Sequence, residues 1–182
     1  MPIADSCRLY GGLDGFHANA SDSSRRDEDD DITTMDLAAY DQMMDTNTRG
    51  FLMCTRHALP HLVKRGGAML YTSSGAAYVG MRTRPTYAMG KSAIHALSRH
   101  VANRWGKQGV RSNVIAPGLI VHEAVRKIMD DKALEGALGG VATPRLGLPE
   151  DIAAMAALLL SDEGAFITGQ VICVDGGSTM RP

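Results

Sequence analysis

The 182-residue sequence lacks the features of several protein classes. Its three cysteines are few, odd in number and far apart, so they do not form a disulfide framework and they favour a reducing, cytoplasmic location. The formal net charge is −1 without a basic stripe, and nucleic-acid binding is therefore not expected. The sequence has no apolar run of membrane-spanning length and does not begin like a signal peptide. We expect a cytoplasmic protein whose partners include neither nucleic acid nor membrane.

Metal-ligand patterns are also weak. His57 and His61 have helical spacing for two ligands, but no Glu follows His57, no third ligand is in view, and Pro60 disturbs the intervening turn. The acid-rich run within residues 21–34 lacks the glycine and the closing Glu of an EF-hand loop, so a solvated loop is the better interpretation. No metal site is predicted.

At 182 residues the chain is long enough for one domain with a hydrophobic core, over residues 1–182, and short apolar runs alternate with helical patterns along it. The predicted strands are 13–18, 68–72, 110–116 and 171–174. The predicted helices are the tail of a helix within 1–12, then 35–64, 86–105, 123–140 and 149–160. We expect the helix over 35–64 to bend near Pro60, and the apolar stripe of 123–140 fits either a mobile lid or core packing.

The stretch from Leu70 to Lys91 carries the strongest chemical signal. Ser74 follows a predicted strand, and Tyr87 and Lys91 lie four residues apart in a predicted helix. That spacing places both side chains on one helix face, where the Lys91 ammonium can stabilise a Tyr87 phenolate. A phenol with such a neighbour can act as an acid or a base near neutral pH.

The order of these residues within the whole chain resembles the short-chain dehydrogenase/reductase (SDR) family. The matching positions are Asn19-Ala20, Asn47, Ser74, Tyr87, Lys91, Pro117-Gly118, residues 167–170 and residues 174–177. The resemblance implies an α/β fold with a Rossmann-like, doubly wound parallel sheet. It also implies an NAD(P)-dependent oxidoreductase that interconverts a secondary alcohol and a ketone.

The resemblance assigns the catalytic roles. In the reduction direction Ser74 would hydrogen-bond the carbonyl oxygen and Tyr87 would protonate it, while Lys91 would bind the cofactor ribose. Asn47, at a helix kink in the family, would hold a water that connects to Lys91. A solvent-facing Asn47 is the plainer alternative.

The same resemblance assigns contacts to NAD or NADP. Asn19 would brace the centre of the sheet, and Pro117-Gly118 would lie against the nicotinamide. The cofactor-binding set is Asn19, Ala20, Tyr87, Lys91, Pro117 and Gly118. His122 stands where the family has a threonine that contacts the cofactor phosphates, which weakens the match there.

The glycine-rich cofactor turn of the family has no counterpart in this sequence. If 13–18 matches the fourth strand of the family, then the first three strands, roughly 60–70 residues, are missing and 13–18 is an edge strand. A truncated reading frame, part of a longer protein and a diverged partner subunit all remain open. We expect impaired cofactor binding, and a non-catalytic remnant or scaffold subunit is the alternative function.

Two further expectations concern substrate and assembly. The apolar stripe from Ala124 to Leu138 suggests a hydrophobic small-molecule substrate, such as a steroid-like or alicyclic alcohol. The helices that contain Asn47 and Tyr87, together with the C-terminal strand, resemble the assembly surfaces of the family, which implies a homodimer or homotetramer.

Overall fold

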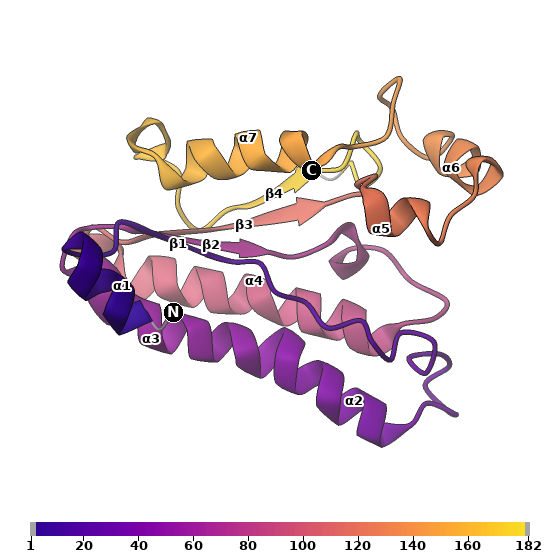
Figure 1. The fold of residues 1–182 in the computed structure, drawn as a ribbon, viewed down its shortest axis with the longest axis horizontal. Coiled ribbons are helices and arrows are strands. Elements are labelled where there is room, and N and C mark those ends of the chain that lie inside the picture. The colour runs from indigo at the N-terminus through magenta and orange to yellow at the C-terminus, as the bar shows by residue number, and fades with distance from the viewer. Residues whose placement is uncertain (1–2, 181–182) are drawn as a thin grey trace.

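The computed structural model describes residues 3–180 and contains a parallel sheet with helices on both faces (Figure 1). Four strands follow one another across the sheet in the order β1-β2-β3-β4, and all three neighbouring pairs are parallel. The strands are β1 (Gly15–Ala18), β2 (Ala68–Thr72), β3 (Arg111–Pro117) and β4 (Val171–Val174). The predicted α/β fold with a parallel sheet is confirmed, and β1 lies at one edge of the described sheet.

Helices connect the strands and cover them. They are α1 (Ile3–Tyr10), α2 (Leu37–Met44), α3 (Phe51–Val63), α4 (Pro85–Trp105), α5 (Glu123–Arg126), α6 (Asp131–Leu138) and α7 (Pro149–Leu160). The chain between α2 and α3 is a π-helical segment, Asp45–Gly50. Within residues 3–180, no helix combines the length and the apolar character of a membrane span.

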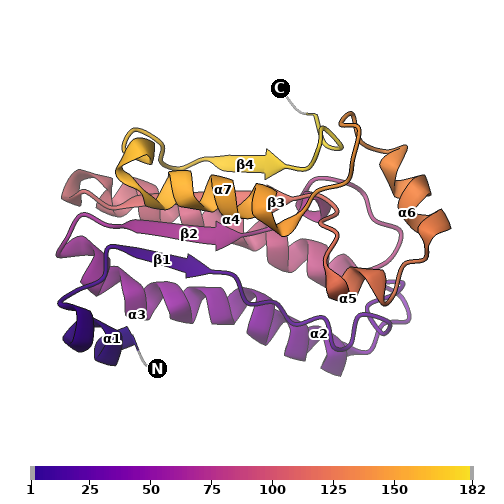
Figure 2. The same ribbon diagram turned by 45° about the horizontal axis from the view of Figure 1, so that its top comes forward.

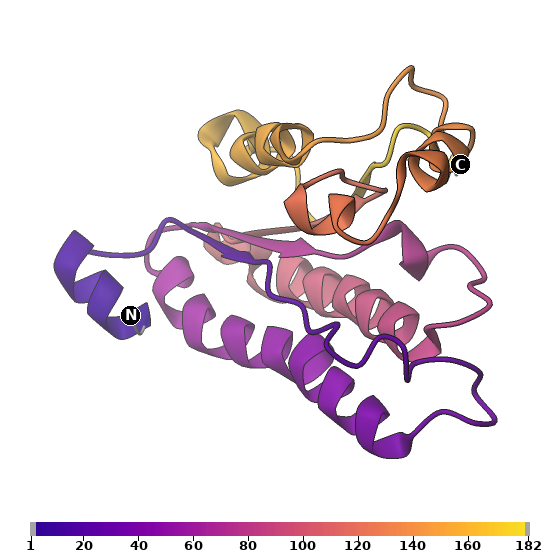
Figure 3. The same cartoon turned by 45° about the vertical axis from the view of Figure 1, so that its right-hand side comes forward.

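Alternating side chains of β2 face two different layers. Met69 and Tyr71 join the larger core under α3 and α4, whereas Leu70 packs with Ile115 and Leu159 under α7. Figure 3 shows α7 on one side of the sheet and α3 and α4 on the other. This period of two is what a strand buried on both faces produces.

The connection from β3 to β4 passes over the opposite face of the sheet from the first two connections. The chain moves in one direction from β1 to β4, but α3 and α4 cover one face and α7 covers the other. The β3–β4 connection therefore has the opposite hand to the connections before it. Its long first part, residues 118–148, passes beyond the carboxyl ends of the strands with α5 and α6 (Figure 2).

Helix α3 is not interrupted at Pro60, and a bend there stays a prediction. Helix α3 runs through Pro60 to Val63, and the irregular turns lie earlier, at Asp45–Gly50. Pro60 is exposed, so water can replace the hydrogen bond that a proline removes from a helix. The predicted helix over 35–64 is otherwise present as α2, the π-helical segment and α3.

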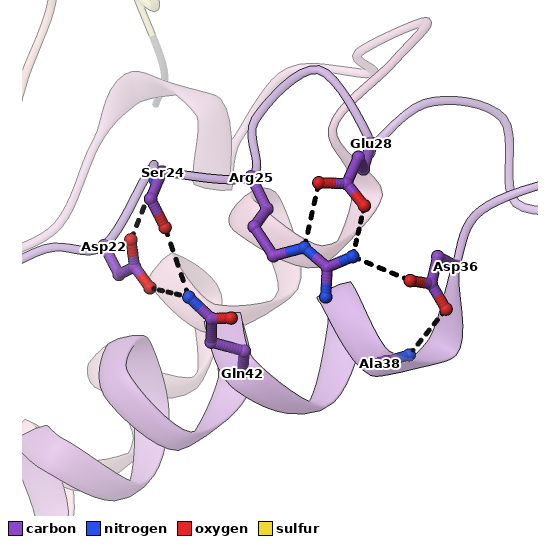
Figure 4. Close-up of polar contacts among 7 residues, drawn as sticks. All are labelled: Asp22, Ser24, Arg25, Glu28, Asp36, Ala38 and Gln42. Atoms are coloured by element: carbon purple, nitrogen blue, oxygen red, sulfur yellow. Dashed lines mark hydrogen bonds and ion pairs between the residues drawn. The ribbon is translucent and has the colours of Figure 1, made fainter.

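The charged run after β1 folds back onto α2 (Figure 4). Arg25 hydrogen-bonds both carboxylate oxygens of Glu28 and donates to Asp36 over 2.7 Å. Asp36 in turn caps α2, and Gln42 of α2 donates to Asp22 over 3.1 Å. This segment is mostly exposed, as predicted, but it is tied to a helix rather than freely solvated.

The predicted helix over 123–140 is two short helices separated by Lys127–Asp130. Neither α5 nor α6 contains a buried residue, and Ile128 is 64% exposed. The core-packing alternative for this stripe is therefore wrong. Asp130 breaks the helix because its carboxylate accepts a hydrogen bond from Ala133 N and caps α6.

Candidate active site

A cavity of about 1070 Å³ lies at the carboxyl ends of the strands. In parallel α/β sheets this edge is the usual place for ligands. The cavity brings together six of the residues singled out from the sequence: Asn19, Ser74, Tyr87, Lys91, Pro117 and Gly118. It does not include Ala20 or Asn47.

Ser74 begins the turn that leaves β2. Its backbone is extended, and its Oγ accepts a hydrogen bond of 3.2 Å from Ala76 N at the start of a 3₁₀ turn. Because Oγ acts as the acceptor in that bond, the hydroxyl proton remains to be donated elsewhere. The turn thus fixes a hydrogen-bond donor at the wall of the cavity.

Tyr87 and Lys91 lie on one face of α4, as their spacing predicted. Tyr87 is half-buried, and the Lys91 Nζ lies 5.7 Å from the centre of its ring. The Lys91 Nζ also donates a hydrogen bond of 3.1 Å to Thr72 O at the end of β2. Helix α4 therefore presents a phenol and an ammonium side by side at the cavity.

Burial changes the acidity of Lys91. The side chain is 2% exposed, and desolvation lowers the pKa of its ammonium to about 8. The main-chain carbonyl of Thr72 is the acceptor that the structure provides for it. A bound ligand can therefore supply further hydrogen-bond acceptors to the Lys91 ammonium.

Asn47 is buried, so the solvent-facing alternative is wrong. Its Oδ1 accepts from Asp22 N over 2.9 Å and from Ser21 Oγ over 3.2 Å, and its Nδ2 donates to Asp22 O over 2.8 Å. The side chain therefore holds the segment that follows β1. The water link from Asn47 to Lys91 stays a prediction, and the Asn47 main chain lies close to Gly90 of α4.

Asn19 and Ala20 are exposed at the carboxyl end of β1. β1 lies at one edge of the described sheet, Asn19 lines the cavity there, and its bracing role stays a prediction. Pro117 and Gly118 end β3 on the opposite side of the cavity. A Cβ on Gly118 would lie 2.8 Å from the Asp175 Cα, so this close approach to the last turn requires glycine.

Asp29 is a residue that the sequence interpretation missed. It is 1% exposed, and its two carboxylate oxygens accept hydrogen bonds of 2.9 Å each from Thr86 N and Tyr87 N. A carboxylate at a helix N-terminus satisfies unpaired amides and complements the helix dipole. The acid-rich run gave no signal that one of its acids reaches the helix that carries Tyr87.

Arg84 is a second missed residue. It precedes α4 with φ of 67°, the single positive φ of a non-glycine residue among residues 3–180. Its guanidinium carbon lies 4.2 Å from the centre of the Tyr87 ring, and its side chain lines the cavity. Pro85 at the first position of α4 was the available signal for a special backbone here.

The histidine pair does not form a metal site in the described chain. His57 is exposed, and within residues 3–180 no three His, Cys, Asp or Glu side chains are placed to hold a metal ion. The absence of a bound metal in the protein stays a prediction.

Comparison with known proteins places this geometry in context. The family model described as enoyl-(acyl carrier protein) reductase matches residues 3–179. A probable short-chain type dehydrogenase/reductase of Bradyrhizobium diazoefficiens is 42% identical over 171 residues, which are 93% of this chain and 61% of that protein. A 7alpha-hydroxysteroid dehydrogenase of Bacteroides fragilis is 31% identical over 180 residues, covering 98% of this chain and 69% of that protein.

Solved structures agree with the sequence comparisons. A short-chain type dehydrogenase/reductase from Mycobacterium ulcerans superposes with a TM-score of 0.89 at 34% identity, covering 98% of this chain and 65% of that one. A 7 alpha-hydroxysteroid dehydrogenase complexed with NADH and 7-oxo glycochenodeoxycholic acid has a TM-score of 0.87 at 27% identity, with coverages of 98% and 69%. The chain thus spans about two thirds of the length of the proteins it matches.

Proposed function

Because this chain belongs to the short-chain dehydrogenase/reductase family, we propose that the protein interconverts a secondary alcohol and a ketone with a nicotinamide cofactor. The observation that carries the proposal is the meeting of Ser74, Tyr87 and Lys91 at one cavity. They come from the end of β2 and from α4, and only the folded chain brings them together. Relatives that are named as dehydrogenases support the same reaction class.

The proposed roles are those that the family resemblance implies for the three side chains. Ser74 donates a hydrogen bond to the substrate carbonyl oxygen, and Tyr87 transfers a proton to that oxygen during reduction. In the oxidation direction Tyr87 takes the proton back from the alcohol. Lys91 holds positive charge beside the phenol and favours its ionised form. Asn47 contributes by holding Ser21 and Asp22 in the segment that follows β1.

The cavity fits the nicotinamide and ribose part of the cofactor. Asn19, Pro117 and Gly118 line it together with Tyr87 and Lys91. Gly118 packs against the last turn at Asp175, and the Lys91 ammonium can donate to ribose hydroxyls. When bound, NADH or NADPH supplies the hydride that reduces the carbonyl carbon. The choice between NAD and NADP is open.

Replacement of Tyr87 by Phe tests the proposal. It removes the proton donor and keeps the ring, so turnover should fall about 10²- to 10⁴-fold while cofactor binding is retained. The matched control is Tyr78→Phe, because the Tyr78 ring stacks on His95 with centroids 5.0 Å apart and does not line the cavity. Steady-state kinetics of the full-length protein with a panel of alicyclic ketones provides the measurement. Undiminished turnover in Tyr87→Phe would refute the assignment.

We propose a hydrophobic substrate body for the same site. One wall of the cavity is apolar and comes mainly from the segment before α4 and from the long β3–β4 connection. Its apolar residues are Val79, Met81, Leu119, Ile120, Ala124, Val125, Ile128 and Met129. A panel in which only highly charged compounds react would contradict this proposal.

A homodimer or homotetramer is the proposed assembly. An apolar groove of about 580 Å³ runs between α3 and α4, and Leu52 beside it is 53% exposed. Light scattering of the full-length protein should show an oligomer, and Leu52→Glu should shift it toward monomer. A monomer for the unchanged protein would rule the assembly out.

We propose that the 182 residues alone bind the cofactor weakly, because no glycine-rich phosphate turn occurs in them. Titration of the chain with NADH and NADPH in a calorimeter measures this directly, and micromolar binding would refute it. A scaffold subunit would show the same weak binding. It would differ by gaining stability or activity with a full-length relative.

The free state of all three cysteines supports the proposed cytoplasmic location.

A further inference from the structure

Arg84 is held in a conformation that its residue type disfavours. Its backbone lies in the left-handed region at φ 67° and ψ 45°, where a side chain is strained. The backbone amide of Arg84 donates a hydrogen bond of 2.6 Å to Asp29 O, which fixes the strained residue in place. Glycine or asparagine would occupy this position more easily, so the presence of Arg at position 84 calls for a reason other than backbone geometry.

The charge of Arg84 is also poorly placed for stability. A cation at a helix N-terminus is opposed by the helix dipole, and Arg84 immediately precedes α4. No carboxylate within residues 3–180 lies close enough to form an ion pair with it. Its stabilising contact is the face of the Tyr87 ring, 4.2 Å from the guanidinium carbon.

The Arg84 side chain also has an unused hydrogen bond. Its Nε is buried and has no acceptor, and the Oγ1 of Thr86 two residues later is in the same state. These are the two buried side-chain polar atoms without a partner in the described chain. A buried donor without an acceptor is costly, so the placement of this side chain calls for a reason other than stability.

These observations meet at the cavity. Arg84 lines it beside Tyr87, and apolar side chains such as Val79 and Met81 line it on the same side. We propose that Arg84 binds a carboxylate of the substrate, so that the protein acts on ketones or alcohols with an apolar body and one carboxylate. The inference rests on the proposed function and names the substrate class of that site.

The charge balance of the cavity favours a carboxylate over a phosphate. Arg26 is the other arginine on the wall, and its Nε lies 3.7 Å from Asp27, which also lines the cavity and offsets its charge. Lys91 faces Tyr87 and is held by Thr72 O. The proposed function assigns Lys91 to the cofactor ribose, which leaves the Arg84 guanidinium for the substrate, and its planar donors match the two oxygens of a carboxylate.

The test uses matched substrates and matched variants of the full-length protein. Oxocyclohexanecarboxylates are compared with their methyl esters, since the pair differs in charge at a single group. The variants are Arg84→Gln, which removes the charge but keeps a polar side chain and the backbone strain, and Arg82→Gln, an exposed neighbour that does not line the cavity. We expect kcat/KM for the acids to exceed that for the esters by about 10- to 100-fold, the factor expected for a hydrogen bond to a charged group.

Arg84→Gln should remove this preference, because kcat/KM for the acids should fall further than kcat/KM for the esters, and Arg82→Gln should keep it. Equal turnover of acids and esters by the unchanged protein would overturn the inference. An equal fall for both substrates in Arg84→Gln would also overturn it, because Arg84 would then only support Tyr87.

A binding measurement separates this inference from the proposed function. Cyclohexanecarboxylate, which cannot be reduced as a ketone, is titrated into the protein in a calorimeter. Binding to the unchanged protein and to Arg82→Gln but not to Arg84→Gln supports the carboxylate subsite even if no ketone is turned over. Absence of binding, or equal binding to Arg84→Gln, would count against the subsite whatever the activity.

Discussion

The two ends of α4 differ in how their side chains are packed and hydrogen-bonded. Toward its C-terminal end the helix is packed as a core element: Ile94 and Val101 are buried in the larger core, and the buried Ser98 and Ser112 hydroxyls pair at 2.9 Å. Toward its N-terminal end the helix carries a strained residue, a buried ammonium and two polar atoms without partners. One helix thus combines a half that stabilises the fold with a half that costs stability.

The difference teaches where chemistry is located in this molecule. Violations of the rules of packing and polar satisfaction concentrate where a ligand can complete them. At the N-terminal end the compensation comes from Asp29, whose carboxylate caps the helix from 57 residues earlier in the chain. The site is therefore supported by a loop as well as by the sheet.

The largest expected effect is a loss of stability on substitution in the C-terminal half of α4. Ile94→Ala removes a side chain that is 1% exposed, and the cavity left behind should lower the free energy of unfolding by about 2–5 kcal/mol. Urea denaturation measures the change. Met89→Ala on the same helix, where the side chain is 49% exposed, should cost much less. Equal losses for both variants would show that the C-terminal half is not a core.

The second prediction concerns the N-terminal half of α4, where the Asp29 carboxylate caps the helix. Asp29→Ala leaves the amides of Thr86 and Tyr87 without their acceptor, and the free energy of unfolding should fall by about 1–3 kcal/mol. Hydrogen exchange should then become faster at these two amides in particular. Asp27→Ala, two residues earlier and with a 98% exposed side chain, is the control. Unchanged exchange in Asp29→Ala would contradict the capping role.

The third prediction uses pH. Burial lowers the pKa of Lys91 to about 8, below its value in the unfolded chain, so between these two values the unfolded state binds more protons. Stability should therefore rise as pH increases from about 8 toward 10, by about 1–2 kcal/mol. Lys91→Met should lack this rise and should be more stable than the unchanged chain at pH 7. Parallel pH dependence of the two proteins in urea denaturation would refute the assignment to Lys91.

The smallest effect concerns strain. Arg84→Gly removes a side chain from a backbone with φ of 67° and should raise the free energy of unfolding by up to about 1 kcal/mol, because glycine tolerates this region. Arg82→Gly, at an exposed position without positive φ, should be neutral or destabilising. A loss of stability in Arg84→Gly as large as in Arg82→Gly would mean that position 84 is not strained.

Local patterns predicted much of this fold. The strands 68–72 and 171–174 and the helix over 149–160 have the bounds that apolar periodicity and turn residues indicated. Ser74, Tyr87 and Lys91 meet at the cavity because their spacing along one strand-turn-helix unit is itself a local property. Such features need no knowledge of distant contacts.

The features that the sequence did not reveal depend on long-range contacts. Asp29 looks like its acidic neighbours until the loop folds onto α4, and Asn47 looks like a helix-surface residue until Ser21 and Asp22 reach it. The break at Lys127–Asp130 depends on the capping bond of Asp130, which competed with an uninterrupted apolar stripe. In each case the hydrogen-bond partner of a polar side chain could not be identified from the neighbouring residues in the sequence.

The π-helical segment also keeps the buried faces of α2 and α3 on the same side of the molecule. From α2 into α3, every fourth residue is buried, and these residues are Ala39, Met43, Asn47, Phe51 and Thr55. In a regular α-helix each step of four residues turns the side chain about 40° past a full turn, so this row would wind away from the core. The wider turns at Asp45–Gly50 absorb the drift. Deletion of a single residue from this segment would rotate α2 by about 100° relative to α3 and expose its apolar side, so length here should be more constrained during evolution than residue identity.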